Sequence, residues 1–224
     1  MYKIETHLHT KPVSACARFE PEEMIGFYKD AGYSTVFISD HFSPSHFDKL
    51  GDELTWAQKV DLLYESFIRA RKKGEELGIT VLFSPEYSLH DNHYLIYNTT
   101  PEFLKSREDF FEISLEEFYH YAKVHNVSII QAHPYRDGKC TPQPNYVDGF
   151  EAINSNPRQE NFDDRVFSLA KKYQCLLSAG SAAHRSEDIA GAAVLSPYEV
   201  KTADEYLDLL KSGKAKLMKD GKII

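Results

Sequence analysis

Histidine and acidic residues recur at the points where the candidate strands of this sequence end. His7 and His9 are separated by one residue at the end of a predicted strand over residues 2–9. Because side chains alternate along a strand, both histidines point to the same side and can bind one cation. Further polar residues of this kind close or adjoin later predicted strands: Asp40, His41, Glu86, His93, His133 and His184. Imidazole with carboxylate suits Zn, Mn or Fe, so the pattern predicts a metal site.

Each of these residues is weak evidence when it is taken alone. A single histidine at a strand end is more often a satisfied polar residue than a ligand, and His-x-His also occurs by chance on exposed strands. The combination is stronger, because the ends of parallel strands in a barrel converge on one face. The remaining histidines are interpreted as loop, surface or solvated helix residues: His46, His90, His120 and His125.

The elements that must position these residues alternate along the chain. Short β-branched or aliphatic runs predict strands over residues 2–9, 35–39, 79–84, 94–97, 127–132, 149–153, 175–179 and 192–195. Amphipathic stretches predict helices over residues 21–31, 55–77, 115–125, 161–173 and 203–211. Strand, helix and strand repeated in this way predict an α/β fold with a mostly parallel sheet, closed into a barrel. The length predicts a single domain over residues 1–224.

Composition narrows the class of protein. The 224 residues are 42% hydrophobic and 27% charged, which is typical of a globular protein and excludes collagen and coiled coils. A net charge of −8 without a basic run argues against binding long nucleic acid or an anionic membrane surface. Cys16, Cys140 and Cys175 are odd in number and widely spaced. They are typical of reduced thiols, and with no apolar leader or membrane span they predict a cytoplasmic protein.

Five motifs together resemble the polymerase and histidinol phosphatase (PHP) family. In chain order they are His7-Leu8-His9-Thr10, Ser39-Asp40-His41, Glu86, Ala132-His133-Pro134 and Gly180-Ser181-Ala182-Ala183-His184. The resemblance spans residues 3–185, and residues 186–224 would complete the same domain. It implies a distorted TIM-like barrel of seven β/α units whose strand ends bind two or three Mn, Zn or Fe ions. It also implies hydrolysis of phosphate esters.

Carried over to this sequence, the resemblance also implies a division of the ligands. His7 and His9 would bind a first metal. Glu86 would bridge this metal and a second one, which His93 and His133 would also bind.

The same resemblance implies a third metal position, or one shared with the first. His41 and His184 would bind it. The family usually offers another acidic or histidine ligand in the loop after His-x-His, where this chain has Cys16. Cys16 is interpreted as a loop or buried thiol rather than as a substitute ligand.

The larger departure from the family pattern is Ala182. Members commonly carry an aspartate there that binds the first metal, and alanine has no donor atom. The explanations are an engineered inactive variant, a naturally weakened enzyme, or a descendant kept for binding alone. Because the rest of the site is intact, we favour an engineered Asp→Ala change.

The predicted chemistry is attack on phosphorus by hydroxide held between two metals beside Glu86. Two cations can neutralise the phosphoryl oxygens and lower the pKa of a bridging water. Asp40 is expected to orient a ligand imidazole or to cap a helix. A protonated histidine or a metal-bound water would assist the leaving oxygen. Glu86, Asp40 and His184 are therefore the candidate catalytic residues.

Arginines near the motifs are the candidate phosphate-binding groups, because guanidinium binds phosphate bidentately. Arg18, Arg136 and Arg185 each follow one of the motifs, and we expect at least one of them to contact substrate. The expected substrate is a small phosphomonoester, such as histidinol phosphate or a nucleotide. The alternatives are an amidohydrolase-type metal hydrolase, disfavoured because no strand-end lysine is evident, and a PHP-derived binding protein, suggested only by Ala182. The sequence leaves the oligomeric state open.

Overall fold

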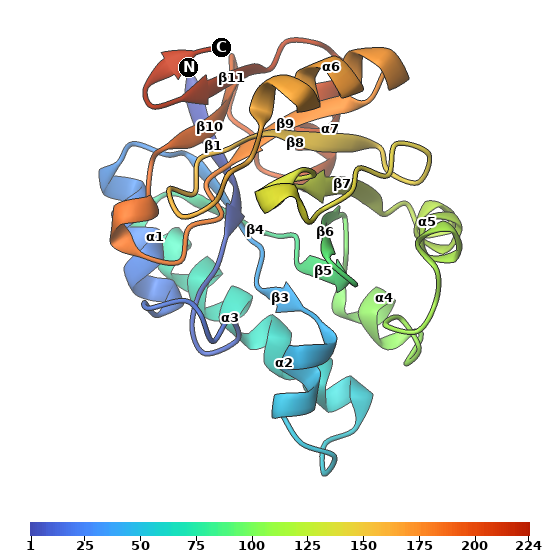
Figure 1. Ribbon diagram of the computed structural model, residues 1–224. Coiled ribbons are helices and arrows are strands. Elements are labelled where there is room, and N and C mark those ends of the chain that lie inside the picture. The colour runs from blue at the N-terminus through green and yellow to red at the C-terminus, as the bar shows by residue number, and fades with distance from the viewer.

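The computed structural model describes residues 1–224 and contains two six-stranded sheets (Figure 1). Strands of the first sheet are, in chain order, β1 (Tyr2–Leu8), β2 (Thr35–Ile38), β4 (Thr80–Phe83), β10 (Ala192–Ser196), β11 (Lys216–Lys219) and β12 (Lys222–Ile223). Strands of the second are β3 (His41–Phe42), β5 (Glu86–Leu89), β6 (Asn92–Tyr97), β7 (Ser128–Ala132), β8 (Gly149–Asn154) and β9 (Leu176–Gly180). Their spatial orders are β12-β11-β10-β1-β2-β4 and β3-β5-β6-β7-β8-β9.

The two sheets adjoin on both sides of the site. On one side, β2 and β4 run on into β3 and β5, and the Glu86 amide donates to the Asp40 carbonyl at 3.1 Å. On the other, Leu8 at the end of β1 forms an isolated bridge with Ala183, just beyond β9. The strands therefore surround one region, but their pairing is divided between two sheets. The predicted α/β class is confirmed, whereas no closed barrel forms.

The sheets also contain more antiparallel strand pairs than the mostly parallel sheet predicted from the sequence. Strand β6 pairs antiparallel with both β5 and β7, and neighbouring strands along β1-β10-β11-β12 are also antiparallel. The other strand pairs are parallel. Only a short turn joins β5 to β6, and it contains His90 with a φ of 55°. A parallel pair needs a crossover of about a dozen residues or more. A connection this short therefore dictates a hairpin.

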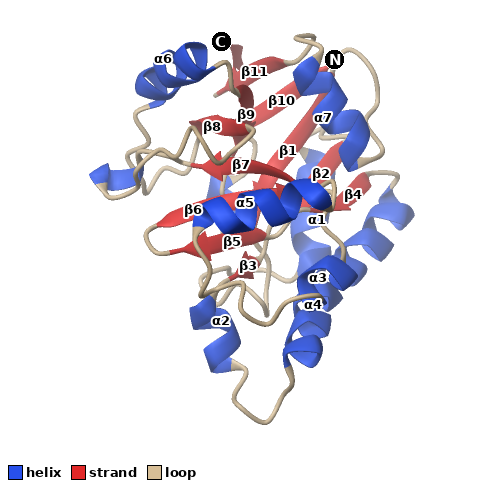
Figure 2. Cartoon of the chain, turned by 90° about the vertical axis from the view of Figure 1, so that its right-hand side faces the viewer, coloured by secondary structure: helices blue, strands red, loops and turns tan.

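Helices surround the strands (Figures 1 and 2). They are α1 (Pro21–Asp30), α2 (Pro44–Lys49), α3 (Trp56–Leu77), α4 (Pro101–Lys105), α5 (Leu115–Val124), α6 (Asp163–Tyr173) and α7 (Ala203–Lys211). Helix α3 packs against α1 and β4, and α6 packs against β8. The five predicted helices are confirmed to within two residues at each end, and the short helices α2 and α4 were not predicted.

The ends of the longest helix follow from local chemistry. Thr55 and Gln58 form a reciprocal capping box at the start of α3, satisfying amide groups that the helix leaves unpaired. Gly78 ends the helix in the left-handed conformation, with φ at 64°. Within α3, Gly74 lies so close to β4 that an added Cβ would stand 2.5 Å from a Val81 methyl carbon. The absence of a side chain there lets helix and strand approach.

One hydrophobic cluster of 54 buried residues runs through both sheets and the helices against them. Its largest fully buried side chains are mostly aromatic, including Tyr28, Tyr97 and Phe150. The aromatic content of the sequence is therefore mainly core packing. No helix in the structure is both long enough and apolar enough to span a membrane.

Candidate metal centre

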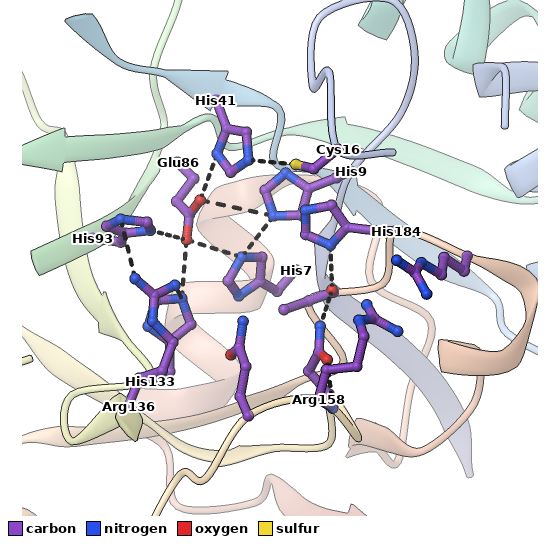
Figure 3. A pocket seen from close by; sticks show the side chains of 14 residues that line it. His7, His9, Cys16, His41, Glu86, His93, His133, Arg136, Arg158 and His184 are labelled. Carbon is purple, nitrogen blue, oxygen red and sulfur yellow. Dashed lines mark hydrogen bonds and ion pairs between the residues drawn. The ribbon is translucent and has the colours of Figure 1, made fainter. Parts of the chain in front are cut away.

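The candidate site is a cavity of about 300 Å³ where ends of strands from both sheets meet (Figure 3). Its walls carry imidazole, carboxylate, thiol and guanidinium groups. The lining residues are His7, His9, Cys16, His41, Glu86, His93, His133, Arg136, Asn156, Arg158, Gln159, Ala182, His184 and Arg185. All seven residues expected to bind metal are among them.

One oxygen of Glu86 faces three imidazoles. Glu86 Oε1 lies 3.2 Å from His7 Nε2, 3.0 Å from His93 Nδ1 and 3.2 Å from His133 Nε2. Figure 3 shows these side chains directed at the carboxylate from different strands. His7, Glu86 and His133 are all buried, and each offers a donor atom within 4.8 Å of the other two. We call these three residues the inner triad.

The other oxygen of Glu86 faces a second group. Glu86 Oε2 lies 2.8 Å from His41 Nδ1 and 3.7 Å from His9 Nε2. His9, His41 and His184 also offer donor atoms within 4.8 Å of one another, and we call them the outer triad. His7 and His9 thus fall into different triads, whereas the resemblance to the PHP family implies that they share a metal. Their Nε2 atoms are 3.0 Å apart, as the alternation along β1 predicts.

A glutamate that sequence reasoning missed fixes the orientation of His7. Glu151 Oε1 lies 2.9 Å from His7 Nδ1, and Glu151 Oε2 accepts a hydrogen bond from the His133 amide. Glu151 is fully buried within β8. Its signal in the sequence was a lone acid inside an apolar run, between Phe150 and Ala152. A carboxylate on Nδ1 leaves Nε2 of His7 to face the cavity.

Asp40 does not contact an imidazole or line the cavity. It accepts hydrogen bonds from Thr10, Ser14 and Ser66, and Ser14 Oγ in turn lies 3.2 Å from His9 Nδ1. Because the Ser14 hydroxyl donates its proton to Asp40, its oxygen can accept a hydrogen bond from His9 Nδ1. The other ring nitrogen of His9, Nε2, is then free to face the cavity. Asp40 therefore lies where it can orient His9 through Ser14, as expected for a carboxylate that positions an imidazole, and it lies outside the cavity lining.

His184 and Cys16 complete the outer side of the cavity. His184 Nδ1 donates to the Ala182 carbonyl at 2.7 Å, so its other ring nitrogen, Nε2, is not engaged by that carbonyl. Cys16 Sγ lies 3.3 Å from His41 Nε2. Burial raises the pKa of the Cys16 thiol, but hydrogen bonds with His184 and His41 outweigh it and lower the pKa to about 6.

Contacts with anionic groups raise the pKa of some histidines in the cavity, and burial lowers the pKa of others. Burial alone would lower the pKa of His7, but the charges of Glu151 and Glu86 raise it to about 10. The pKa of His41 is also raised to about 10, because hydrogen bonds with Cys16 and Glu86 outweigh the effect of burial, which alone would lower it. Burial lowers the pKa of His133 to about 4 and that of His9 well below its usual value. The latter two imidazoles are therefore neutral at pH 7.

One buried polar atom supports the fit of a cation. Glu86 Oε2 is buried, and its 2.8 Å approach to His41 Nδ1 is not a well-formed hydrogen bond. Leaving such an atom unsatisfied is costly, so a further partner is expected for it. Imidazole nitrogens and a carboxylate converging on the same small volume form a donor set that suits Zn, Mn or Fe. The residues of both triads therefore fit divalent cations.

Three arginines line the cavity: Arg136, Arg158 and Arg185. Arg136 places its guanidinium 3.4 Å from His133 Nε2, beside the inner triad. Arg158, which was not predicted, is held by a two-bond ion pair with Asp188. Arg18 is exposed and outside the cavity lining, because the loop that carries it turns its side chain to solvent. Glu86 is the one carboxylate in the lining, so the walls favour an anion.

Ala182 has a positive φ of 46°. Alanine is unfavourable in this region, whereas aspartate and asparagine are enriched there. The backbone at this position is therefore better suited to the aspartate that the family pattern would place there. The histidines interpreted as surface or loop residues, namely His46, His90, His120 and His125, all lie outside the cavity lining.

No known protein-family model and no curated protein sequence matches this chain. Solved structures do match it. A two-domain protein of Bacteroides vulgatus containing a predicted PHP-like metal-dependent phosphoesterase is 12% identical, with a TM-score of 0.70 over 99% of this chain and 66% of its own. A protein of Bifidobacterium adolescentis assigned as a metal-dependent phosphoesterase is 15% identical, with a TM-score of 0.58 over 94% of this chain and 95% of its own. An amidohydrolase of Chromobacterium violaceum is 13% identical, with a TM-score of 0.56 over 96% of this chain and 97% of its own.

These likenesses establish the fold of the chain. It has a PHP-type fold, and the resemblance inferred from the five motifs is confirmed at that level. The similar structures include both phosphoesterases and an amidohydrolase, so the fold is compatible with either reaction.

Proposed function

We propose that this chain is a metal-dependent hydrolase of small phosphate monoesters that uses two divalent cations held on either side of Glu86. One observation carries the proposal. The two oxygens of a single buried carboxylate are shared between two sets of imidazoles, with His7, His93 and His133 on Oε1 and His9 and His41 on Oε2. A bridging carboxylate between two ligand sets is what a two-cation centre requires.

The cations would be held by the two triads. His7, Glu86 and His133 would bind one, with His93 beside them, and His9, His41 and His184 would bind the other. When bound, two such cations neutralise the phosphoryl oxygens and lower the pKa of a water molecule between them. Zn, Mn and Fe all suit this donor set. We assign His184 to ligand binding rather than to proton donation, because it offers a donor atom within 4.8 Å of donor atoms of His9 and His41.

The chain's own contribution to substrate binding comes from its arginines. Arg136, Arg158 and Arg185 can donate to the non-reacting oxygens of a phosphate, and Asp188 fixes the direction of Arg158. Glu151 and Asp40 keep His7 and His9 in the orientation that presents Nε2 to the cavity. A cavity of about 300 Å³ favours a small phosphomonoester such as histidinol phosphate or a nucleotide over long nucleic acid.

The second candidate is an amide hydrolase, which the likeness to the amidohydrolase favours. Against it, the cavity lining contains three arginines and no lysine. Arg158 and Arg185 already have carboxylate partners, Asp188 and Glu187, but an uncharged amide would leave the Arg136 guanidinium without an anionic partner. The third candidate, a binding protein without turnover, is supported by Ala182, which supplies no ligand atom.

The test is hydrolysis of two substrate panels by the metal-reconstituted chain. Phosphate release from small phosphomonoesters and amide cleavage are measured with Mn²⁺, Zn²⁺ or Fe²⁺, using this chain, Ala182→Asp and Glu86→Gln. We expect metal-dependent phosphate release that Ala182→Asp increases and Glu86→Gln abolishes. Amide cleavage without phosphate release would overturn the phosphoesterase assignment. Metal binding with no turnover of either panel, even by Ala182→Asp, would favour the binding protein.

A further inference from the structure

A second cavity, of about 490 Å³, adjoins the metal centre, and we call it the side groove. Two residues, His41 and His93, line both the first cavity and the side groove. Both imidazoles contact Glu86, with His41 on Oε2 and His93 on Oε1, and Figure 3 shows them on either side of that carboxylate. A molecule held at Glu86 can therefore extend past these imidazoles into the side groove.

The pairing of three strands explains why the side groove continues the metal centre. His41 of β3 pairs with Glu86 of β5. Two residues further along β5, Ser88 pairs with His93 of β6. Because alternate side chains of a strand share a face, and directly paired residues share one too, Ser88 lies on the face that carries Glu86. Ser43, two residues after His41, extends this face in the same way and also lines the side groove.

The hydrogen-bonding groups that the side groove adds to this face are mainly hydroxyls, from Ser43, Ser45 and Ser88. Ser43 Oγ accepts from the His46 amide at 3.3 Å and lies 3.2 Å from Ser45 Oγ. The bond between the two serines uses one of their hydroxyl protons and leaves the other for a ligand. The Ser88 side chain is half-buried and has no hydrogen-bond partner within the chain. It can therefore both donate to a ligand and accept from one.

The side groove differs from the metal centre in charge. Its lining contains no lysine, arginine or carboxylate, and its only ionisable side chains are the imidazoles of His41, His90 and His93. The first cavity, in contrast, has three arginines. A cationic group that entered the side groove would find no carboxylate to pair with, so the groove favours a neutral group.

Phe111 gives the side groove an apolar wall. Its half-buried ring packs against Phe42 and Phe47, with ring centroids 4.8 and 5.3 Å away, so the wall is held in place. An aromatic surface beside several hydroxyls suits a ligand that has C–H groups on one side and hydroxyls around its edge. A sugar has both features.

We propose that the side groove binds the leaving group of the substrate, and that this group is a neutral, polyhydroxylated alcohol, so that the substrate is a sugar phosphate. The inference rests on the proposed function and narrows its substrate class. The phosphate would lie at the metal centre, the sugar hydroxyls would bond to Ser43, Ser45 and Ser88, and Phe111 would cover the C–H groups. In the reaction, the oxygen of a water molecule bonds to phosphorus and the P–O bond to the sugar breaks. The sugar oxygen takes one proton of that water.

Paired substrates separate the side groove from the metal centre. Ribose 5-phosphate and glucose 6-phosphate would fill the groove, methyl phosphate has no group to place there, and phosphoethanolamine would bring a cation into it. We measure kcat and KM for each ester with the Mn²⁺-reconstituted chain, with Ser88→Ala and with Phe111→Leu. Ser168→Ala, which removes an exposed hydroxyl on α6, is the matched control. Saturation-transfer NMR of the sugar phosphates with the metal-free chain gives a readout that does not depend on turnover.

All of these esters meet the same metal centre, so the ratio of kcat/KM for a sugar phosphate to that for methyl phosphate reports on the side groove. We expect kcat/KM to be at least about tenfold higher for a sugar phosphate than for methyl phosphate or phosphoethanolamine, since several hydroxyl bonds add together. Ser88→Ala should lower the ratio by about 3–10-fold. Phe111→Leu should weaken saturation of the sugar C–H protons, and Ser168→Ala should change neither readout.

Two results would overturn the side groove and leave the phosphoesterase assignment standing. One is equal kcat/KM for the sugar phosphates and methyl phosphate, and the other is a Ser88→Ala variant that keeps the full ratio while Phe111→Leu keeps the full saturation. If neither the unaltered chain nor Ala182→Asp releases phosphate from any phosphomonoester, both the side groove and the proposed function are overturned.

Discussion

His7 and Glu151 form a buried pair in which the carboxylate Oε1 lies 2.9 Å from imidazole Nδ1. The two residues are 144 positions apart in the chain, on β1 of one sheet and β8 of the other. Glu151 also accepts from the His133 amide and from Asn154. One side chain therefore orients two residues of the inner triad, and it does so across the junction of the sheets.

Glu151→Gln should weaken cation binding without removing a ligand. The amide can still accept from His7, but its NH₂ group would face the amide of His133 and the NH₂ group of Asn154, both of which are donors. We expect metal affinity to fall by about 10–100-fold and the free energy of unfolding by about 1–3 kcal/mol. Calorimetric titration and denaturant unfolding measure the two effects. The exposed Glu112→Gln is the control, and equal metal affinities of the two variants would contradict the role of Glu151.

Gly180→Ala should disturb the same pair by crowding. An added Cβ would stand 2.6 Å from Glu151 Oε1 and 2.6 Å from the Cβ of His7. Overpacking of this kind costs about 1–3 kcal/mol, so thermal unfolding should occur at a lower temperature and metal affinity should fall. Gly26→Ala is the matched control, since a Cβ there meets nothing within 4 Å in helix α1. Gly26→Ala should raise the free energy of unfolding by about 0.5–1 kcal/mol. A Gly180→Ala variant with unchanged thermal unfolding and metal affinity would show that the backbone shifts to accommodate the methyl group.

Cation binding should release protons. In the metal-free chain, nearby carboxylates and Cys16 raise the pKa of His7 and His41 to about 10, so both imidazoles are protonated at pH 7. A cation at either triad must displace one of these protons. The apparent affinity at each position should therefore rise about tenfold per pH unit as pH increases from 6 to 9. Titration calorimetry in buffers of different ionisation enthalpy measures the release, and heats independent of the buffer would contradict it.

Arg136→Gln and Arg185→Gln should each raise KM for a phosphomonoester. A charge-assisted hydrogen bond to phosphate contributes about 1.5–3 kcal/mol, which corresponds to a KM increase of about tenfold or more. Neither arginine has a buried carboxylate partner, so stability should change little. Steady-state kinetics check the prediction, with Arg71→Gln on the exposed side of α3 as the control. Unchanged KM in both variants would mean that these guanidinium groups do not contact the substrate.

The sequence was sufficient for the features that depend on local pattern. The helix from Ala203 to Lys211 was predicted with both ends correct, because Thr202 supplies a cap and the apolar stripe is regular. The ligand candidates were also identified, because histidines at strand ends share one face once the strands lie together. His7 in β1 and His9 just after it illustrate this, since alternation puts both side chains on one side of the chain, where their Nε2 atoms lie 3.0 Å apart.

Features that depend on partners distant in the chain were missed. The antiparallel pairing of β1 with β10 joins residues nearly 200 positions apart, such as Tyr2 and Ser196, and no local pattern specifies it. Glu151 was read as part of a buried strand, since its partner His7 is in another sheet. Arg158 was overlooked because it follows no motif, and Arg18 was favoured because it follows one. Proximity in sequence was a poor guide to which guanidinium group reaches the cavity.

The number of divalent cations that the chain holds at saturation decides whether the cavity is a two-cation centre. Metal-free protein is dialysed against Zn²⁺ or Mn²⁺, and the bound metal is counted per chain for the unaltered protein, Glu86→Gln and the control Glu112→Gln. A two-cation centre bridged by Glu86 predicts two ions for the unaltered chain and the control, and at most one for Glu86→Gln. An unaltered chain without bound metal, or a Glu86→Gln chain that still holds two ions, would contradict the two-cation centre.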